Sequence, residues 1–404
     1  MAVNLPPMGD LLPIDGLSIG AAKAGVKYAD RLDLAVMVLD AGGVTGGVFT
    51  KSAFAAAPVV LARQRVGAAR ALVVNSGNAN AATGERGLAD ARATCAHVAT
   101  VLGVQESEVL PFSTGVIGEF LDMDAMRRGV DAAAVAVSPS GWADAAHAIM
   151  TTDTAPKALS RSATVGGVPI RATGMVKGSG MIRPDMATLL AFLGTDAAVS
   201  ADVAATLARD LAERSFNRVT IDGDTSTNDS FVVMATGKAG GRVVDDTASS
   251  AYRELRDALA PVVVELAERT ARDGEGATKF MTVRVEQGAS APECLEVAFT
   301  IAHSPLIKTA VFAGDPNWGR FCMAIGRAHV ADLDPGAVDL YLDDVCVARG
   351  GLMADEYTEE AGAAVMARDE FTVRVLLGRG DASETVWTSD LSYDYVRINA
   401  EYRT

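Results

Sequence analysis

Apolar and polar positions along this chain alternate in blocks that predict strands and helices in turn. Short apolar runs of strand length lie at 71–74, 109–112 and 189–193, and we expect each of them to be a buried strand. Between the first two runs, apolar side chains recur at steps of three and four: Leu88, Ala91, Cys95, Val98 and Leu102. This spacing predicts a helix over 85–102 with one apolar face, and the order strand, helix, strand is typical of α/β architecture.

Further elements follow from the same patterns. Two hairpins are expected, one over 32–50 with its turn at 41–43 and one over 163–174 with its turn at two glycines. Helices are predicted at 122–137, 141–150, 200–215 and 247–272. We expect Pro261 to bend or interrupt the last of them.

The length of the chain predicts more than one packed unit. A chain of 404 residues is too long for one ordinary core. A polar break at 197–200 marks the first predicted boundary. We therefore expect an N-terminal sandwich domain at 1–198, a middle α/β segment at 199–279 and a C-terminal α/β domain at 280–404.

The stretch 174–194 carries the chemistry that matters most. Its glycines and its proline prevent a helix or a regular central strand around Lys177, so a loop carrying one cation is expected there. Thr188 lies on the seam between this loop and the strand 189–193. A hydroxyl therefore sits where irregular backbone meets a rigid sheet.

That position suits a threonine that becomes a new chain terminus. If its hydroxyl attacks the carbonyl of Ala187 and the bond between the two residues breaks, Thr188 gains a free α-amine. Such an amine titrates at roughly 7.7–8.0 and can accept the hydroxyl proton as a base. The alternative is a β-branched residue that merely starts a strand.

Other polar residues have two interpretations each. Thr114 and Gly115, after the strand 109–112, supply the hydroxyl and the free backbone N–H groups of an oxyanion hole, or simply form a strand-to-helix turn. The hydroxyl of Thr151 can hold a substrate carboxylate or amide, or serve as a turn or cap. Glu275, in a glycine-flanked acidic loop, can pair with a substrate ammonium or remain solvated. The segment 222–229 lacks the ligand order of a calcium loop and is expected to be a hydrogen-bonded turn that supports the site.

Composition excludes several classes of function. A net charge of −15 and only 5% aromatic residues argue against nucleic acid or an anionic membrane as a partner. No apolar run approaches the ~18 residues of a membrane span, and the N-terminus lacks the features of a signal peptide, so a cytoplasmic protein is expected.

The four histidines form no spaced cluster and the four cysteines no C-x-x-C pair. We therefore expect neither a metal site nor a serine–histidine triad.

A family resemblance decides between these interpretations. Lys177-Gly-Ser-Gly-Met-Ile, then Pro184, then Met186-Ala-Thr-Leu-Leu resembles the self-cleavage signature of the ornithine acetyltransferases, also called glutamate N-acetyltransferases. Further blocks resemble the family in the same order along the chain: 75–80, 113–115, 150–153, 222–229, 273–279, 314–320 and 397–400.

The resemblance implies a fold and an activity. The fold is α/β (α+β), a layered αββα-type sandwich with N-terminal-nucleophile-like chemistry plus a smaller C-terminal α/β domain. The activity is transfer of an acetyl group from N2-acetyl-L-ornithine to L-glutamate in arginine biosynthesis, after self-cleavage between Ala187 and Thr188. Acetyl-CoA is implied as a possible further donor, no cofactor is expected, and two copies of each cleaved chain would form an α2β2 assembly.

The resemblance also assigns residues. It implies that Thr188 is the nucleophile and that Thr114 and Gly115 stabilise the oxyanion. The implied substrate-binding residues are Thr151, Lys177, Thr188, Glu275, Asn399 and Thr404, although the last two belong to a tail that would otherwise be expected to fray. Lys177 either holds a substrate carboxylate or lowers the pKa of the new α-amine.

Two other functions use the same residues. An amidohydrolase or aminopeptidase with an N-terminal nucleophile would pass the acyl group to water instead of glutamate. A non-catalytic amino-acid-binding protein would use the glycine-rich loops to hold a ligand without chemistry, and its chain would stay uncut.

Overall fold

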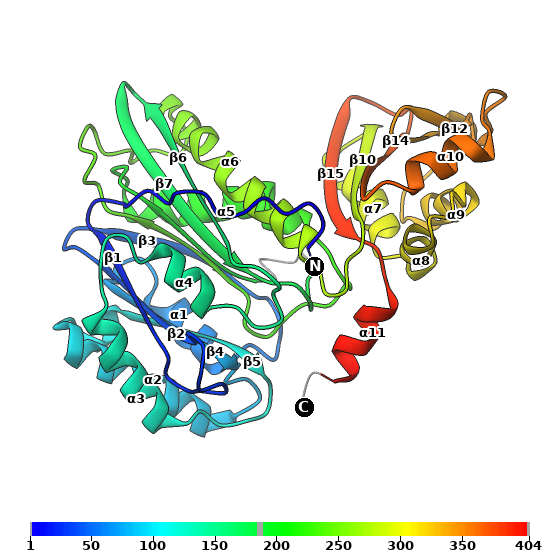
Figure 1. Ribbon diagram of the computed structural model, residues 1–404. Coiled ribbons are helices and arrows are strands. Elements are labelled where there is room, and N and C mark those ends of the chain that lie inside the picture. Colours follow the sequence, from blue (N-terminus) through cyan, green and yellow to red (C-terminus); the bar gives the residue numbers. More distant parts are fainter. Residues whose placement is uncertain (1, 184–188, 402–404) are drawn as a thin grey trace. The chain divides into compact units, whose positions relative to one another are not determined.

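The computed structural model describes residues 2–183 and 189–401, and the chain divides into two compact units (Figure 1). We call the first the sandwich unit, which comprises Pro7–Asn217 and Thr225–Thr270. The second, the C-terminal unit, comprises Met1–Pro6, Arg218–Asp224 and Ala271–Thr404.

Two β-sheets form the centre of the sandwich unit. The first sheet has the order β1-β2-β4-β5, with β1 Leu17–Ala22, β2 Leu34–Leu39, β4 Ala71–Asn78 and β5 Val109–Val116. The second has the order β3-β9-β8-β7-β6, with β3 Val44–Phe49, β9 Ser230–Ala235, β8 Leu190–Thr195, β7 Val168–Lys177 and β6 Lys157–Val165. Phe112 of the first sheet meets Phe192 of the second edge to face, with ring centroids 5.2 Å apart. The main core of the unit therefore lies between the two sheets.

Helices cover the outer faces of both sheets (Figure 1). Helices α2 Gly84–Leu102 and α3 Met123–Val135 share a second core with the first sheet, to which Cys95 and Val130 contribute. Helices α5 Ala201–Arg214 and α6 Ser250–Arg272 pack on the second sheet. Two shorter helices, α1 Ala57–Arg65 and α4 Trp142–Ala148, send side chains into the core between the sheets, and η1 Glu106–Glu108 precedes β5. The predicted αββα layering is confirmed.

Most predicted elements of this unit are present, and two details differ. The expected hairpin over 32–50 is wrong, because β2 and β3 flank its turn but belong to different sheets. The hairpin of β6 and β7 is confirmed, with Val165 paired to Val168 around the two glycines. Helix α6 runs through Pro261 without interruption, so of the two expected effects of this proline, a bend or a break, the break is absent.

The C-terminal unit has one six-stranded sheet of order β13-β12-β11-β14-β10-β15. Its strands are β10 Phe280–Gly288, β11 Asp339–Leu342, β12 Val345–Arg349, β13 Leu352–Met353, β14 Glu370–Leu376 and β15 Ala382–Ser389. Its helices are α7 Ala291–Ala302, α8 Pro305–Ala313, α9 Trp318–Arg327, α10 Glu359–Met366 and α11 Tyr393–Ala400, with the short η3 Pro335–Ala337. A single core joins the sheet to α7, α8, α9 and α10.

The division into units differs from the three predicted segments. The predicted boundary at residue 198 falls inside the sandwich unit, because β9 pairs in parallel with β8 and α5 packs on β3. The chain leaves the sandwich unit at η2 Phe216–Arg218 and returns to it at Thr225. The polar break near residue 198 therefore separates a strand from a helix of the same unit.

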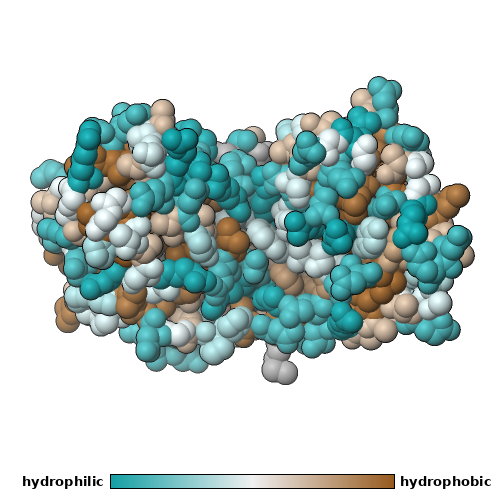
Figure 2. Space-filling view, turned by 90° about the horizontal axis from the view of Figure 1, so that it is seen from above, coloured by the Kyte–Doolittle hydropathy of each residue, from teal (hydrophilic) through white to brown (hydrophobic). Residues whose placement is uncertain are grey.

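Within residues 2–183 and 189–401, no single helix is long and apolar enough to cross a membrane. Helices α7 and α8 reach the required length and hydropathy only as a pair, bent by 59°, and both contribute buried side chains to the core of the C-terminal unit. On the face shown in Figure 2, hydrophilic residues predominate and apolar residues appear in separate small groups.

Candidate active site

The candidate site of the sandwich unit begins at the carboxyl ends of two neighbouring parallel strands. In β4 and β5, Ser76 lies opposite Thr114 and Gly77 lies opposite Gly115. Ligands of open α/β sheets bind beyond the carboxyl ends of parallel strands, where side chains leave the regular ladder. Thr114 and Gly115 therefore end a strand, and do not form the separate strand-to-helix turn that was the alternative.

The backbone conformation at position 115 and the space around it require glycine. Its φ of +134° is one that other residues rarely adopt, and a Cβ built on it would lie 2.2 Å from the carbonyl carbon of Gly77. The close approach of the two strands at this point thus depends on a residue without a side chain.

Lys177 brings three of the predicted site residues together. It is the last residue of β7, and its Nζ donates hydrogen bonds to Thr114 Oγ1 at 3.1 Å and to Thr151 Oγ1 at 2.8 Å. A hydroxyl that accepts a bond from an ammonium still has its own proton to donate. Thr114 is thereby arranged as a polarised donor, which is what a developing oxyanion needs.

A buried ion pair supports this cluster from behind. Asp153 accepts hydrogen bonds from Lys157 Nζ at 2.6 Å and from the backbone N–H groups of Thr151 at 3.0 Å and Gly178 at 2.7 Å. Both side chains of the pair have 0% exposure. Burial by itself would raise the pKa of Asp153, but the charges of Lys157 and Lys177 outweigh it and hold that pKa well below its usual range.

Asp229 is a second buried carboxyl near Lys177. Its side chain accepts a hydrogen bond from the N–H of Ser226 at 3.1 Å, and the residue is 2% exposed. Burial raises the pKa of Asp229 well above its usual range, although the bonds from Ser226 and the charge of Lys177 act in the opposite direction. The cluster thus contains one carboxyl whose pKa is lowered by the neighbouring ammonium groups and one whose pKa is raised by burial.

The predicted nucleophile and cleavage site, Thr188 and Ala187, lie outside the described residues. The described chain resumes at Leu189, whose carbonyl oxygen accepts a hydrogen bond from the N–H of Ser230 at 2.8 Å. Leu190 then pairs with Lys177 on one side and with Ser230 on the other. The end of β7 and the starts of β8 and β9 therefore lie next to one another, at the same end of these three inner strands of the second sheet.

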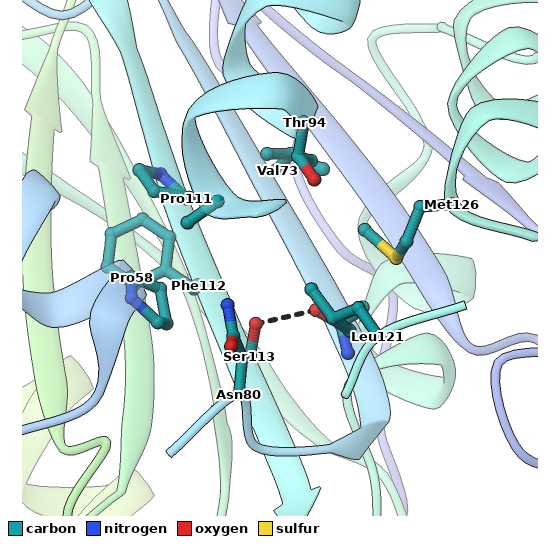
Figure 3. Close-up of a pocket in the computed structure, with 11 residues that line it drawn as sticks. Pro58, Val73, Asn80, Thr94, Pro111, Phe112, Ser113, Leu121 and Met126 are labelled. Carbon is teal, nitrogen blue, oxygen red and sulfur yellow. Dashed lines mark hydrogen bonds between the residues drawn. The ribbon is translucent and has the colours of Figure 1, made fainter. Parts of the chain in front are cut away.

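The asparagine-rich segment 75–80 has a structural role. The Nδ2 group of Asn80 donates to the carbonyl of Gly87 at 2.9 Å, and Ser113 Oγ donates to Asn75 Oδ1 at 2.6 Å. Figure 3 shows Asn80 and Ser113 beside a cavity of about 10 Å³, which also has Thr94 of α2 and Met126 of α3 on its wall. Such a cavity holds about one water molecule, so it is too small for an amino-acid substrate.

Two other predicted residues meet in the C-terminal unit. Asn399 Nδ2, on α11, donates a hydrogen bond to Glu275 Oε2 at 2.8 Å, and Glu275 is only 7% exposed. The start of α11 is held to the same loop, because Ser392 Oγ donates to the carbonyl of Gly276 at 2.6 Å. The tail therefore forms an ordered helix up to Ala400, and Thr404 lies outside the described residues.

Sequence reasoning missed the two buried carboxyls and Lys157 as members of the cluster. Asp153 stands in the block 150–153 that carried the resemblance, and Lys157 follows it by four residues. A lysine placed directly before the apolar pair Ala158-Leu159 was the available signal of a buried cation. In the part of the chain that the structure describes, three or more His, Cys, Asp or Glu side chains never gather as a metal site would require. The prediction that no metal takes part stays a prediction.

Comparisons with known proteins identify the family. The ArgJ family model matches residues 18–404. The arginine biosynthesis bifunctional proteins ArgJ of Pseudomonas syringae pv. tomato and Pseudomonas fluorescens are 53% and 52% identical over 405 residues, with 100% of both chains covered in each case. A solved ornithine acetyltransferase of Mycobacterium tuberculosis, complexed with ornithine, is 35% identical, with 44% of this chain and 96% of that chain covered and a TM-score of 0.39.

The resemblance inferred from short motifs is thereby confirmed over nearly the whole sequence. The match to the family model begins at Ser18 and ends at Thr404, so it extends through both compact units. With such coverage, and with half of all positions identical to full-length relatives, the chain belongs to the ArgJ family.

Proposed function

We propose that the protein transfers an acetyl group from N2-acetyl-L-ornithine to L-glutamate through an acetyl ester of Thr188. It is an acyltransferase of arginine biosynthesis, as its family membership and its full-length relatives support. The observation that carries the site assignment is the pair of hydrogen bonds from Lys177 to Thr114 and Thr151. These bonds join a donor for an oxyanion to a cation for a substrate carboxylate.

The reaction proceeds in two halves. Self-cleavage between Ala187 and Thr188 first frees the α-amine of Thr188, which acts as the base for its own hydroxyl. The hydroxyl attacks the acetyl carbonyl of N-acetylornithine, the oxyanion is stabilised by Thr114 and the backbone at Gly115, and ornithine leaves. Glutamate then attacks the acetyl ester and carries the acetyl group away.

The charges of each region suit a group of the substrates. The Lys177 ammonium can pair with a carboxylate. In the C-terminal unit, the Glu275 carboxylate, oriented by Asn399, can pair with an ammonium. We also assign Thr151 and Thr404 to substrate binding.

Three further features belong to the same proposal. The name bifunctional, which both full-length relatives carry, supports acetyl-CoA as a second acetyl donor for glutamate. The chemistry needs no cofactor and no metal, because the nucleophile, its base and the oxyanion donors all come from the chain. An α2β2 assembly of cleaved chains and a cytoplasmic location are expected from the sequence.

The decisive experiment follows the acetyl group. Wild-type protein incubated with N-acetylornithine and no glutamate should show an acetyl adduct on the fragment that starts at Thr188, by intact mass. Thr188→Ala should be uncut and inactive, whereas Thr188→Ser, which retains the hydroxyl, should keep part of both processing and turnover. A Thr188→Ala protein that is cut and active would overturn the proposal, and glutamate-independent release of acetate would indicate a hydrolase instead.

A further inference from the structure

Two cations contact consecutive residues of one segment of the sandwich unit, Met150 and Thr151. Lys177 Nζ donates a hydrogen bond to Thr151 Oγ1 at 2.8 Å. Arg31 Nη2 donates a hydrogen bond to the carbonyl of Met150 at 3.0 Å. The proposed acetyl transfer uses Lys177 and gives Arg31 no role, and an inference about Arg31 rests on that function.

Arg31 belongs to the loop 23–33, which joins β1 to β2 and folds around a buried carboxylate. Asp33 is 1% exposed, and its two side-chain oxygens accept hydrogen bonds from the N–H groups of Ala24 at 2.6 Å and Val26 at 2.7 Å. Such bonds from a side chain to its own loop hold the backbone in one conformation. The carboxylate of Asp33 therefore serves the loop backbone and does not pair with Arg31.

The same loop packs against the end of strand β4. The N–H of Ser76 donates a hydrogen bond to the carbonyl of Asp33 at 2.9 Å. A Cβ built on Gly77 would lie 2.7 Å from the Cβ of Lys27. Gly77 lies opposite Gly115, one of the two proposed oxyanion residues. The loop 23–33 is therefore in contact with the strand ends that form the candidate site.

The guanidinium of Arg31 is oriented by an aromatic ring as well as by the carbonyl of Met150. Its Cζ lies 4.6 Å from the centre of the Tyr28 ring, in the arrangement of a cation over an aromatic face. The two contacts together fix the position of the group. Arginine presents its N–H donors in a planar fork that matches a carboxylate, and it keeps its charge throughout the physiological pH range.

Arg31 is not paired with an acid of its own chain. Within residues 2–183 and 189–401 this half-buried side chain makes one hydrogen bond and no ion pair. Its Nε is buried and has no hydrogen-bond partner there. The chain carries 51 acidic residues and a net charge of −15, so a shortage of acids does not explain this. An oriented guanidinium in this state has N–H groups left for an external anion.

The two proposed substrates differ in charge at the end of the side chain. Glutamate ends in a carboxylate, whereas N-acetylornithine ends in an ammonium. A guanidinium attracts the first group and repels the second. With Lys177 available for one carboxylate, Arg31 supplies a second cation, and glutamate is the substrate with two carboxylates.

We propose that Arg31 binds the side-chain carboxylate of glutamate in the second half of the reaction, while Lys177 binds the α-carboxylate. The guanidinium keeps its contacts with Tyr28 and Met150 and donates its remaining N–H groups to the carboxylate. Arg31 thereby favours a dicarboxylic amino acid as the acetyl acceptor. It has no part in the removal of the acetyl group from N-acetylornithine.

The test separates the two halves of the reaction in Arg31→Met. Protein that carries the acetyl adduct is prepared with N-acetylornithine, freed of ornithine and mixed with increasing concentrations of glutamate, and loss of the adduct is followed by intact mass. The glutamate concentration that gives the half-maximal rate should rise by about 10- to 100-fold, the effect of losing a hydrogen bond to a charged group. The maximal rate should match the wild type. The N-acetylornithine concentration needed to form the adduct should not rise.

Two further variants serve as controls. Lys23→Met removes a positive charge from an exposed position of the same loop and should leave both half-reactions unchanged. Arg31→Lys keeps the charge but loses the planar fork, so its half-maximal glutamate concentration should lie between those of the wild type and Arg31→Met. The thermal unfolding midpoint shows whether each variant folds. If Arg31→Met does not fold, Arg31→Lys should still need more glutamate than Lys23→Met, and equal values would contradict the assignment.

Three results would overturn the role of Arg31. One is an unchanged dependence on glutamate in a folded Arg31→Met protein. Another is an equal loss in both half-reactions, which would show that Arg31 only supports the segment of Met150 and Thr151. The third is a higher KM for acetyl-CoA with no change for glutamate, which would assign a phosphate of that donor to Arg31 instead. Failure of the proposed function would appear separately, as absence of the acetyl adduct in wild-type protein.

Discussion

The carboxylate of Asp153 accepts a hydrogen bond from the backbone N–H of Gly178 at 2.7 Å, across 25 positions of sequence. The same oxygen accepts a bond from Lys157 Nζ at 2.6 Å, and neither side chain of this ion pair is exposed. The bond connects the segment that carries Thr151 to the end of the strand that carries Lys177. The convergence of these two site residues thus depends on a buried anion that has no assigned part in the chemistry.

The first prediction concerns the stability of this ion pair. Asp153→Asn should lower the free energy of unfolding by about 3–5 kcal/mol, because it removes the buried negative charge that pairs with the Lys157 ammonium. Urea denaturation measures the change. The double variant Asp153→Asn with Lys157→Met removes both charges and should regain part of the loss. If the single variant proves as stable as the wild type, the pair does not hold the site as described.

The second prediction concerns Lys177. Replacement by Met keeps the length of the side chain but removes both hydrogen bonds to Thr114 and Thr151. We expect kcat/KM to fall by about 10²–10³, the range seen when one oxyanion-stabilising contact is lost. The measurement is steady-state acetyl transfer per cleaved molecule. Thr151→Val removes only one acceptor of Lys177 and preserves the shape of the side chain, so it should lower kcat/KM by less. Equal losses of kcat/KM in the two variants would show that Thr114 does not depend on the Lys177 ammonium.

Local periodicity predicted the elements that bury one face. The helix 85–102 and the strands at 71–74 and 189–193 are observed close to the expected positions, because a single buried face leaves a regular pattern in the sequence. The hairpin at 32–50 failed for the opposite reason. Its turn has the expected glycines, but β2 pairs with β4 and β3 pairs with β9, and partners so distant in sequence leave no local signal.

The site was predicted in its parts and not in its arrangement. The sequence motifs identified Thr114, Thr151 and Lys177 as candidates. In the structure, Lys177 lies within hydrogen-bond distance of both threonines. Asp153 and Asp229 were missed as ionisable members because their burial results from the packing of distant strands. A carboxyl in a polar turn has the same local sequence whether the fold exposes it or covers it.

The third prediction concerns pH and Lys308. This lysine is buried in the C-terminal unit, where its Nζ donates to Thr388 Oγ1 at 2.9 Å and to the carbonyl of Ser389. Burial lowers the pKa of Lys308 from 10.5 to about 8, against the opposing charges of Asp390 and Asp222. Between these two pKa values the unfolded chain binds a proton that the folded chain does not, so raising the pH favours the folded state.

The stability gained through Lys308 should therefore be absent below about pH 8 and complete above pH 10.5. Its size is on the order of 3 kcal/mol. Other groups titrate in the same range, so the quantity to measure is the difference in unfolding free energy between the wild type and Lys308→Met from pH 7 to 11. That difference should move in favour of the wild type as the pH rises. A difference that is flat with pH would show that Lys308 is not desolvated.

The last prediction concerns the pair Asn399 and Glu275. Asn399 Nδ2 donates to Glu275 Oε2 at 2.8 Å and also to the carbonyl of Tyr395 at 3.0 Å, so its amide is fixed to its own helix and in turn fixes the carboxylate. If Glu275 binds the ammonium of a substrate, loss of this bond leaves the carboxylate free to rotate. Asn399→Ala should then raise the KM for both N-acetylornithine and glutamate by about tenfold, since a hydrogen bond to a charged group contributes about 1.5–3 kcal/mol, while kcat changes little.

The double variant decides whether Asn399 acts through Glu275. In Glu275→Gln the charge is gone, so the position of the side chain matters less and Asn399→Ala should add little further increase in KM. Additive effects of the two substitutions would mean that Asn399 contacts the substrate independently. Ser392 provides the control, because its hydroxyl bonds to the carbonyl of Gly276 in the same loop and not to the carboxylate of Glu275. Ser392→Ala should loosen α11 and lower the thermal unfolding midpoint. Its effect on KM should be the same in the wild-type background and in the Glu275→Gln background. A Ser392→Ala effect that vanishes in Glu275→Gln would instead mean that α11 as a whole positions the carboxylate.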